Sequence, residues 1–199
     1  VVRLLVGHEG GRQDKGGKTA LMRAAQENHP ECVRALLQKE AGMTENNGWT
    51  ALMYAAYRNS TESAGLLLEE EGGMQNNSGR SALMVAVFSN SVDCVRLLLE
   101  REGGLRDKDG WSALMHAARN NRLECATLLL RKEGCMQDSD GWTALMCAAR
   151  NGHAKAVKLL VERERGMQTN NGDTALIMAA EKDHPECVEL LVKHEGGIQ

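Results

Sequence analysis

The chain has 199 residues, a formal net charge of −3 and no block of Lys or Arg, so neither a nucleic acid nor an anionic membrane is the expected partner. Aromatic residues make up only 3% of the sequence, which argues against one large conventional core, while 42% hydrophobic residues are too many for a disordered chain. All apolar runs are short, so neither a transmembrane helix nor a signal peptide is predicted.

The sequence is built from an internal repeat that begins near its first residues. Residues 1–5 are typical of the inside of a helix, and from Thr19 the motif Thr-Ala-Leu-Met, or a close variant, returns every 31 residues. Such a period predicts supersecondary units stacked on their neighbours in one array over residues 1–199. The predicted units are a partial repeat, 1–18, and the repeats 19–49, 50–80, 81–111, 112–142, 143–173 and 174–199.

The unit 143–173 illustrates the predicted local structure. Thr143 is placed to cap a short helix whose inner face is Leu, Met and Ala, and an Arg-Asn-Gly turn ends this helix. A second helix is expected over about 154–164, with Gly166 as its left-handed cap. The loop that follows ends in Asn171-Gly172, a dipeptide that favours tight turns.

The shared pattern, GxTALMxAAxxNxxECVxLLL, resembles the ankyrin pattern GxTPLHxAAxxGHxxVVxLLL in all six units. The resemblance implies an all-α ankyrin-repeat solenoid of stacked helix-turn-helix units. The TALM and EGGMQ motifs are similar to those of large protozoan ankyrin families, some of whose members carry a Nek-like kinase domain. The period of 31 rather than 33 residues predicts short loops, and because neither end resembles a polar capping repeat, we expect a piece of a longer array.

The cysteines fit this arrangement without disulfides. Corresponding positions in stacked units lie about 8–10 Å apart, beyond the reach of a disulfide. One repeat position, which holds Ser63 and Ala156 in two units, is therefore interpreted as a small buried side chain, and reduced thiols predict a cytoplasmic location. Cys135 falls in a loop and is a candidate exposed thiol. The cysteines at the shared position are Cys32, Cys94, Cys125 and Cys187.

No catalytic or cofactor site emerges from the sequence. His29 with Cys32, and His184 with Cys187, each place two ligands one helical turn apart, but a zinc site needs four, so no metal is predicted. Neither a nucleophile–base pair nor a phosphate loop stands out, so neither an enzyme nor a cofactor is predicted. A recurring Glu at the end of the second helix is interpreted as an acceptor for amides of the neighbouring loop; it occurs as Glu9, Glu40, Glu71, Glu102, Glu133, Glu164 and Glu195.

The binding surface is predicted from the resemblance. In ankyrin arrays the concave face is built from the residue before the cap, the outward positions of the first helix and the turn tip. These positions hold every aromatic residue of this chain, and Trp, Tyr and Arg dominate interface energetics. The alternative is that the three Trp merely cover the turns beneath them. The candidate partner-binding residues are Trp49, Tyr54, Tyr57, Arg80, Phe88, Trp111, Arg119, Trp142 and Arg150.

These observations predict a scaffold or adaptor that binds a partner protein or peptide, with apolar anchors flanked by acidic side chains. One alternative is the targeting or regulatory segment of a larger enzyme such as a Nek-like kinase. Another is a small-molecule sensor with a ligand between Tyr57 and Phe88. A nucleic acid, a membrane and a small-molecule cofactor are not expected as partners.

Overall fold

The computed structural model describes residues 10–195, and in this range the secondary structure is helical, without strands. A short helix of seven or eight residues alternates with a helix of eleven residues. The predictions for residues 1–5, for Glu9 and for the side chain of Glu195 concern positions outside the described residues. The helices are α2 (Ala20–Gln26), α3 (Pro30–Glu40), α4 (Ala51–Tyr57), α5 (Thr61–Glu71), α6 (Ala82–Ser89), α7 (Val92–Glu102), α8 (Ala113–Arg119), α9 (Leu123–Glu133), α10 (Ala144–Arg150), α11 (Ala154–Glu164), α12 (Ala175–Glu181) and α13 (Pro185–Glu195).

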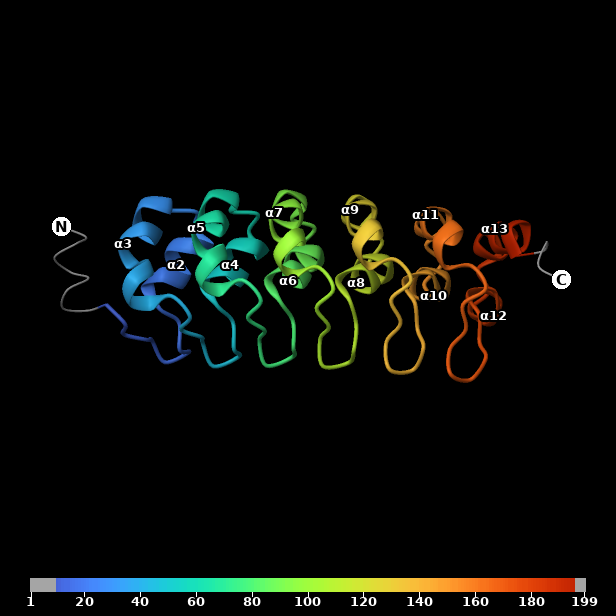
Figure 1. The fold of residues 1–199 in the computed structure, drawn as a ribbon, viewed down its shortest axis with the longest axis horizontal. Helices are drawn as coiled ribbons and strands as arrows, with labels where there is room; N and C mark the ends of the chain where they lie inside the picture. The colour runs from blue at the N-terminus through green and yellow to red at the C-terminus, as the bar shows by residue number, and fades with distance from the viewer. Residues whose placement is uncertain (1–9, 196–199) are drawn as a thin grey trace. The chain divides into compact units, whose positions relative to one another are not determined.

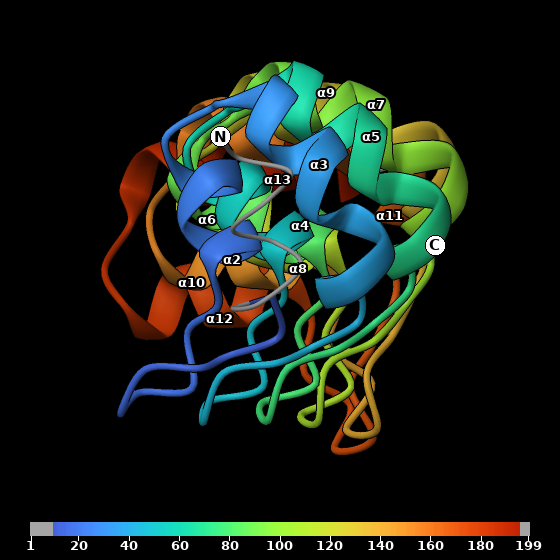
Figure 2. The ribbon, with the colours of Figure 1, turned by 90° about the vertical axis from the view of Figure 1, so that its left-hand side faces the viewer.

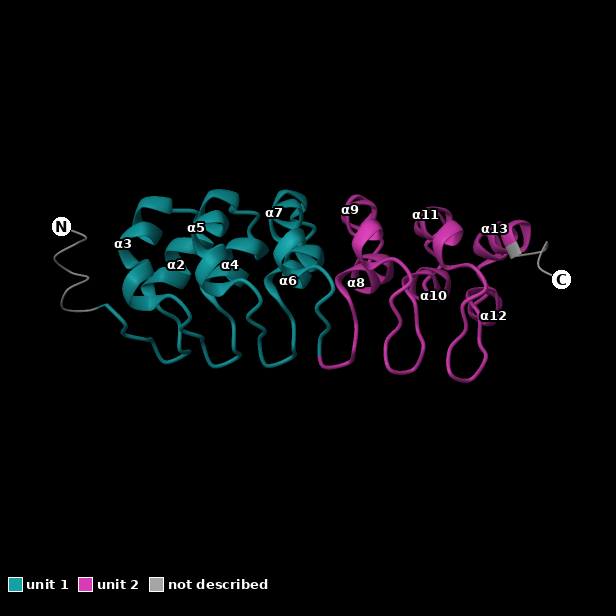
Figure 3. Cartoon of the chain, viewed as in Figure 1, with its two compact units in different colours: residues 1–107 teal, residues 108–199 magenta. Residues whose placement is uncertain are grey.

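The chain divides into two compact units, residues 1–107 and 108–199 (Figure 3). In the first unit the short helices α2, α4 and α6 pack side by side, and the longer helices α3, α5 and α7 form a second layer (Figure 1). The second unit repeats this plan, with α8, α10 and α12 in one layer and α9, α11 and α13 in the other. Within each unit the loops between helix pairs project to one side (Figure 2). Within residues 10–195, each unit is therefore a stack of three helix pairs, as the 31-residue period predicts.

Small and medium-sized apolar side chains make the stacking close. Leu52, Met53 and Ala55 of α4 are fully buried, and Leu67 of α5 meets the same core. Alanine faces let neighbouring helices approach without voids. The shared cysteine position is also in this core: Cys94 and Cys125 are buried, and all six cysteines are free thiols. The interpretation of this position as a small buried side chain is confirmed except at Cys32, which is half-buried.

Helix α4 is capped from two directions. In α4 the Thr50 hydroxyl accepts the Met53 N–H at 3.3 Å, as predicted for a capping Thr. The Glu71 carboxylate, from the end of α5, accepts the Leu52 N–H at 2.7 Å through Oε2. Its other oxygen accepts the Gly42 N–H of the preceding loop at 3.1 Å. One carboxylate thus ties together two helices and a loop.

The buried glutamates resolve an electrostatic conflict. A carboxylate at a helix C-terminus opposes the helix dipole, but Glu71 lies at the N-terminus of α4, where the dipole favours an anion. The predicted bond to a neighbouring loop amide is confirmed, and a second bond, to the first helix of its own repeat, was not predicted. The corresponding bonds to the first helix join Glu40 to Leu21, Glu102 to Leu83, Glu133 to Leu114 and Glu164 to Leu145.

Burial changes the pKa of the buried glutamates. Loss of solvation raises the pKa of Glu71, Glu102 and Glu164 above the usual carboxyl value, although hydrogen bonds from backbone amides oppose the shift. The folded state therefore holds their protons more tightly than the unfolded chain does.

Glu71→Ala is expected to lower the free energy of unfolding by about 3 kcal/mol, because two backbone N–H groups lose their acceptor. Urea unfolding followed by circular dichroism measures the change. Glu70→Ala removes the same side chain from an exposed position of the same helix, and we expect a change within about 0.5 kcal/mol. Equal losses in the two variants would contradict the bridging role of Glu71.

Glu102→Gln is expected to show a pH-dependent penalty. The raised folded-state pKa of Glu102 adds stability below the unfolded pKa near 4.5, and this contribution is lost as pH rises through the folded-state pKa. Glutamine does not titrate, so the difference in unfolding free energy between the parent and the variant should be larger at about pH 5 than at about pH 8. Denaturant titrations at both pH values test this, and a penalty that grows with pH would contradict it.

Cys135 occupies a backbone position that glycine fills elsewhere. Its φ is +69°, in the left-handed region, whereas the corresponding residues one repeat before and after are Gly104 and Gly166, with φ of +96° and +75°. A side chain in this region costs about 1–2 kcal/mol. The predicted exposure of the thiol is confirmed, and the sulfur contacts the Arg163 carbonyl oxygen at 3.1 Å.

Cys135→Gly is expected to raise the free energy of unfolding by about 1 kcal/mol, because glycine adopts this backbone conformation without strain. Thermal and urea unfolding measure the gain. Cys135→Ala removes the thiol but keeps the strained Cβ, so an equal gain in both variants would assign the effect to the sulfur instead.

Candidate partner-binding site

Loop hairpins fix the residue that precedes each cap. The Glu45 N–H donates to the Trp49 carbonyl at 3.0 Å, and the Gly48 N–H closes the turn on the Glu45 carbonyl at 2.8 Å. Asp138, Gly141 and Trp142 repeat this geometry in the second unit. The indole is thereby held at the junction of the loop and the first helix, and the three Trp are half-buried there.

Successive loops are joined in register by amide groups. The backbone N–H of Asn77 donates to the Asn47 carbonyl at 3.0 Å, and that of Asn170 to the Asp140 carbonyl at 2.9 Å. The Gln137 side-chain amide donates to its own loop at Gly141 and to the next loop at Gln168. These bonds keep equivalent loop positions aligned within each unit.

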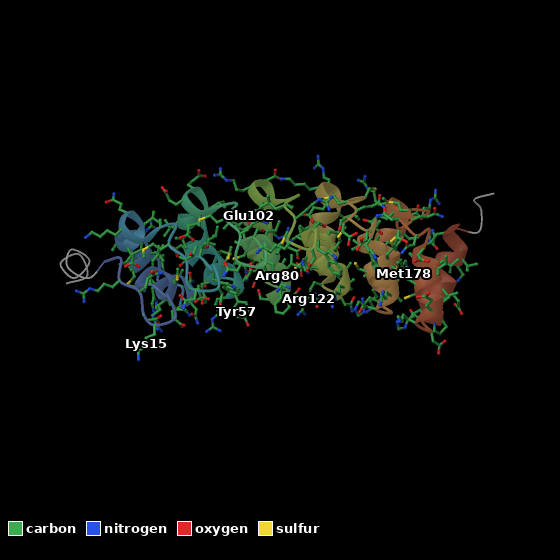
Figure 4. All side chains as sticks on the ribbon, turned by 90° about the horizontal axis from the view of Figure 1, so that it is seen from below. Lys15, Tyr57, Arg80, Glu102, Arg122 and Met178 are labelled. Atoms are coloured by element: carbon green, nitrogen blue, oxygen red, sulfur yellow. The ribbon has the colours of Figure 1, made fainter. Side chains whose placement is uncertain are left out.

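In the first unit, a pocket of about 370 Å³ opens between the repeats 50–80 and 81–111 and the preceding loop. Its walls are aromatic: the rings of Trp49 and Tyr57 lie 6.0 Å apart, and the Arg80 guanidinium lies 6.0 Å from the Phe88 ring centroid. Tyr57 and Phe88 are 45% and 53% exposed, which is unusual for large apolar side chains (Figure 4, with Tyr57 and Arg80 labelled). The remaining lining residues are Asn47, Asn76, Asn77, Ser78 and Val85.

The second unit has a pocket of about 320 Å³ at the corresponding place. The Arg119 guanidinium carbon lies 5.3 Å from the Trp111 ring centroid, and that of Arg150 lies 5.2 Å from the Trp142 ring. These distances fit cation–π stacking. The other lining residues are Asp138, Asp140, Cys147 and Asn151.

The two pockets share one framework but differ in chemistry. They are 62 residues apart in sequence, so Trp111 takes the place of Trp49, while Arg119 and Arg150 take the places of Tyr57 and Phe88. The first pocket is mainly aromatic and amide-lined, and the second carries two cations and two carboxylates. Equivalent positions of the two pockets therefore present different side chains to a partner.

The predicted site residues line these two pockets, except for Tyr54, which lies in the middle of α4. Tyr54 is half-buried, and its hydroxyl donates to Glu45 at 2.6 Å, while Lys18 lies 4.0 Å from its ring centroid. Burial and the Glu45 bond raise the Tyr54 pKa. The residues at the same position of α6 and α10, Val85 and Cys147, are buried and line the two pockets.

Sequence reasoning missed the loop contribution to both pockets. Much of the polar lining comes from the loop between the two helix pairs, through Asn76–Ser78 in one pocket and Asp138 with Asp140 in the other. The signal was present in the sequence, because the same 31-residue step that aligns the Trp residues also aligns these loop positions.

His184, one of the candidate metal ligands, has a structural role, as does His153 at the same position of the preceding repeat. The His153 ring nitrogen Nε2 lies 3.0 Å from the Arg119 carbonyl oxygen, and that of His184 lies 3.1 Å from the Arg150 carbonyl oxygen. Each histidine therefore anchors the end of the short helix that carries a pocket Arg. Among residues 10–195, no cluster of three or more His, Cys, Asp or Glu is placed to hold a metal ion. In the same range no helix combines the length and the apolar character needed to cross a membrane.

Stacked helix pairs with aligned loops define a helical-repeat protein. A family model described as ankyrin repeats (3 copies) matches residues 1–76, 66–138 and 132–199, so the chain belongs to the ankyrin-repeat family. It is similar to a chain in the solved structure of the predatory endopeptidase Bd0816 from Bdellovibrio bacteriovorus in complex with the immunity protein Bd3460. The TM-score is 0.72 and the identity 26%, over 92% of this chain and 99% of that one. No curated protein sequence matches.

Gly141→Ala is expected to destabilise the second unit by about 3 kcal/mol, because a Cβ there would lie 2.8 Å from the Thr169 Cα and 2.9 Å from the Asn170 nitrogen. Gly172 has nearly the same φ, +85° against +83°, but nothing within 4 Å of the added carbon. Gly172→Ala should therefore cost only about 1 kcal/mol. Thermal unfolding measures both, and equal losses would show that loop contact does not constrain this turn.

Proposed function

We propose that this chain is a protein-interaction module without catalytic activity, which binds a partner protein or peptide on the face formed by its short helices and loops. This face corresponds to the concave face of ankyrin arrays. The observation that carries the proposal is the gathering of three Trp, two Tyr and one Phe, every aromatic residue of the chain, at repeat positions that line or adjoin two open pockets.

The energetics of this face support the proposal. Aromatic and Arg side chains bury large areas at low entropic cost and dominate binding energies at interfaces. Tyr57 and Phe88 are exposed on a chain whose core is built from Leu, Met, Ala and Val, so folding alone does not account for their placement. The half-burial of the Trp residues is consistent with both roles considered for them, because each indole is partly covered and partly exposed.

The comparisons are consistent with this function at a coarse level. Ankyrin repeats are generally protein-interaction modules, and the similar solved chain comes from a complex of two proteins. The same proposal includes a single array over residues 1–199 and a relationship to protozoan TALM and EGGMQ arrays, which the repeated motifs support. It also includes a cytoplasmic location, which the free thiols support. The TALM and EGGMQ motifs also support the alternative of a targeting segment in a larger enzyme such as a Nek-like kinase.

The pairs Trp49→Ala with Phe88→Ala, and Trp111→Ala with Arg119→Ala, are each expected to weaken binding of a cellular partner at least tenfold, equivalent to about 1.4 kcal/mol. Affinity capture by the intact array identifies the partner, and calorimetry with the purified partner measures the affinities. Lys158→Ala, at an exposed position of α11, serves as the control. Unchanged affinity in both double variants, with folding intact by circular dichroism, would remove the proposal.

A further inference from the structure

We propose that the pocket of the second unit binds an acidic side chain, Asp or Glu, of the partner protein through Arg119 and Arg150. This inference rests on the proposed function and adds the chemistry of one contact. The pocket is lined by these two arginines, by Trp111 and Trp142, and by carboxylates on its loop side.

Each guanidinium is held in place by its own aromatic ring. The guanidinium carbons lie 5.3 and 5.2 Å from the indole centroids, within cation–π distance. A guanidinium presents its N–H donors in a planar fork that matches the geometry of a carboxylate. Because the side chains are already positioned, less conformational entropy is lost when an anion binds.

Neither arginine is neutralised within the described part of the chain. Arg119 and Arg150 are exposed, and no carboxylate oxygen lies within 4 Å of either guanidinium. Arg23, on the short helix of the first repeat, behaves differently, since its guanidinium meets the Asp14 carboxylate at 2.7 Å. The two pocket arginines therefore keep their charge available for a partner.

The two aspartates define which end of the pocket an anion would occupy. Asp138 Oδ1 accepts the N–H groups of Asp140 and Trp142 at 2.9 and 2.8 Å, so this carboxylate serves the loop turn. Asp140 lies exposed on the same loop. Repulsion from both carboxylates directs an incoming acid away from the loop and toward the arginines at the end of the short helices.

The corresponding pocket of the first unit gives an internal comparison. There Tyr57 and Phe88 stand at the arginine positions, and Asn76 and Ser78 stand at the aspartate positions. This pocket has the same framework, but its only cation is Arg80, so it lacks the pair of guanidinium groups that would hold both oxygens of a carboxylate. The acidic preference should therefore depend on the second unit alone.

A displayed library of random 12-residue peptides tests the inference. Peptides selected on the intact chain should be enriched in Asp and Glu, and this enrichment should disappear on the double variant Arg119→Gln with Arg150→Gln. The matched control, Arg131→Gln with Arg163→Gln, removes the same charge from exposed positions of α9 and α11 and should keep the enrichment. For the best peptide, Glu→Gln should weaken binding at least tenfold on the parent chain and less than twofold on the pocket variant.

Each other result has a definite meaning. Bound peptides whose acidic preference survives in the pocket variant would overturn this inference but leave the proposed function standing. Basic peptides that lose affinity with Asp138→Asn would overturn it in favour of a cation-binding pocket. A phosphoserine in place of Glu that binds more than tenfold tighter would identify a phosphopeptide site instead. If no peptide binds at all, the proposed peptide-binding function fails together with the inference.

Discussion

The structure depends on one recurring interaction, the buried carboxylate that joins the end of each second helix to the start of the first helix of its own repeat. In the repeat 50–80, Glu71 also holds the preceding loop through the Gly42 amide, so one side chain fixes three segments of backbone. A buried anion without a cation is costly, and it is tolerated because backbone amides and the positive end of a helix dipole face it. The pKa of Glu71 is raised because the backbone amides offset only part of the desolvation cost of the carboxylate.

This interaction keeps the repeat length constant. The carboxylate must reach a loop amide 29 residues before it and a helix amide 19 residues before it, and these separations recur at Glu40, Glu71, Glu102 and Glu164. An insertion in the helix pair or the loop would move one of the partners out of reach. Within each unit, equivalent residues therefore form rows, and the chemistry of a row varies without changing the backbone beneath it.

The pockets show how such variation produces specificity. One framework of loop, Trp and short helix carries Tyr57 and Phe88 in the first unit and two arginines in the second. The framework is held by Asn and Gln amides between loops and by histidines that anchor the ends of the short helices. Recognition residues are thus free to differ, because other side chains stabilise the fold.

The sequence alone determined the helix pairs, their boundaries, the capping Thr and the repeat register, since local capping and a strict 31-residue period leave few alternatives. It also indicated the candidate residues Trp49, Phe88, Trp111 and Arg119, because their repeat positions are shared. Only the tertiary structure decided that Val85 and Cys147 are buried, and that Asp138 and Asp140 line a pocket with the arginines. These outcomes depend on the direction of side chains and on contact between neighbouring loops, and a periodic pattern in one dimension does not specify either.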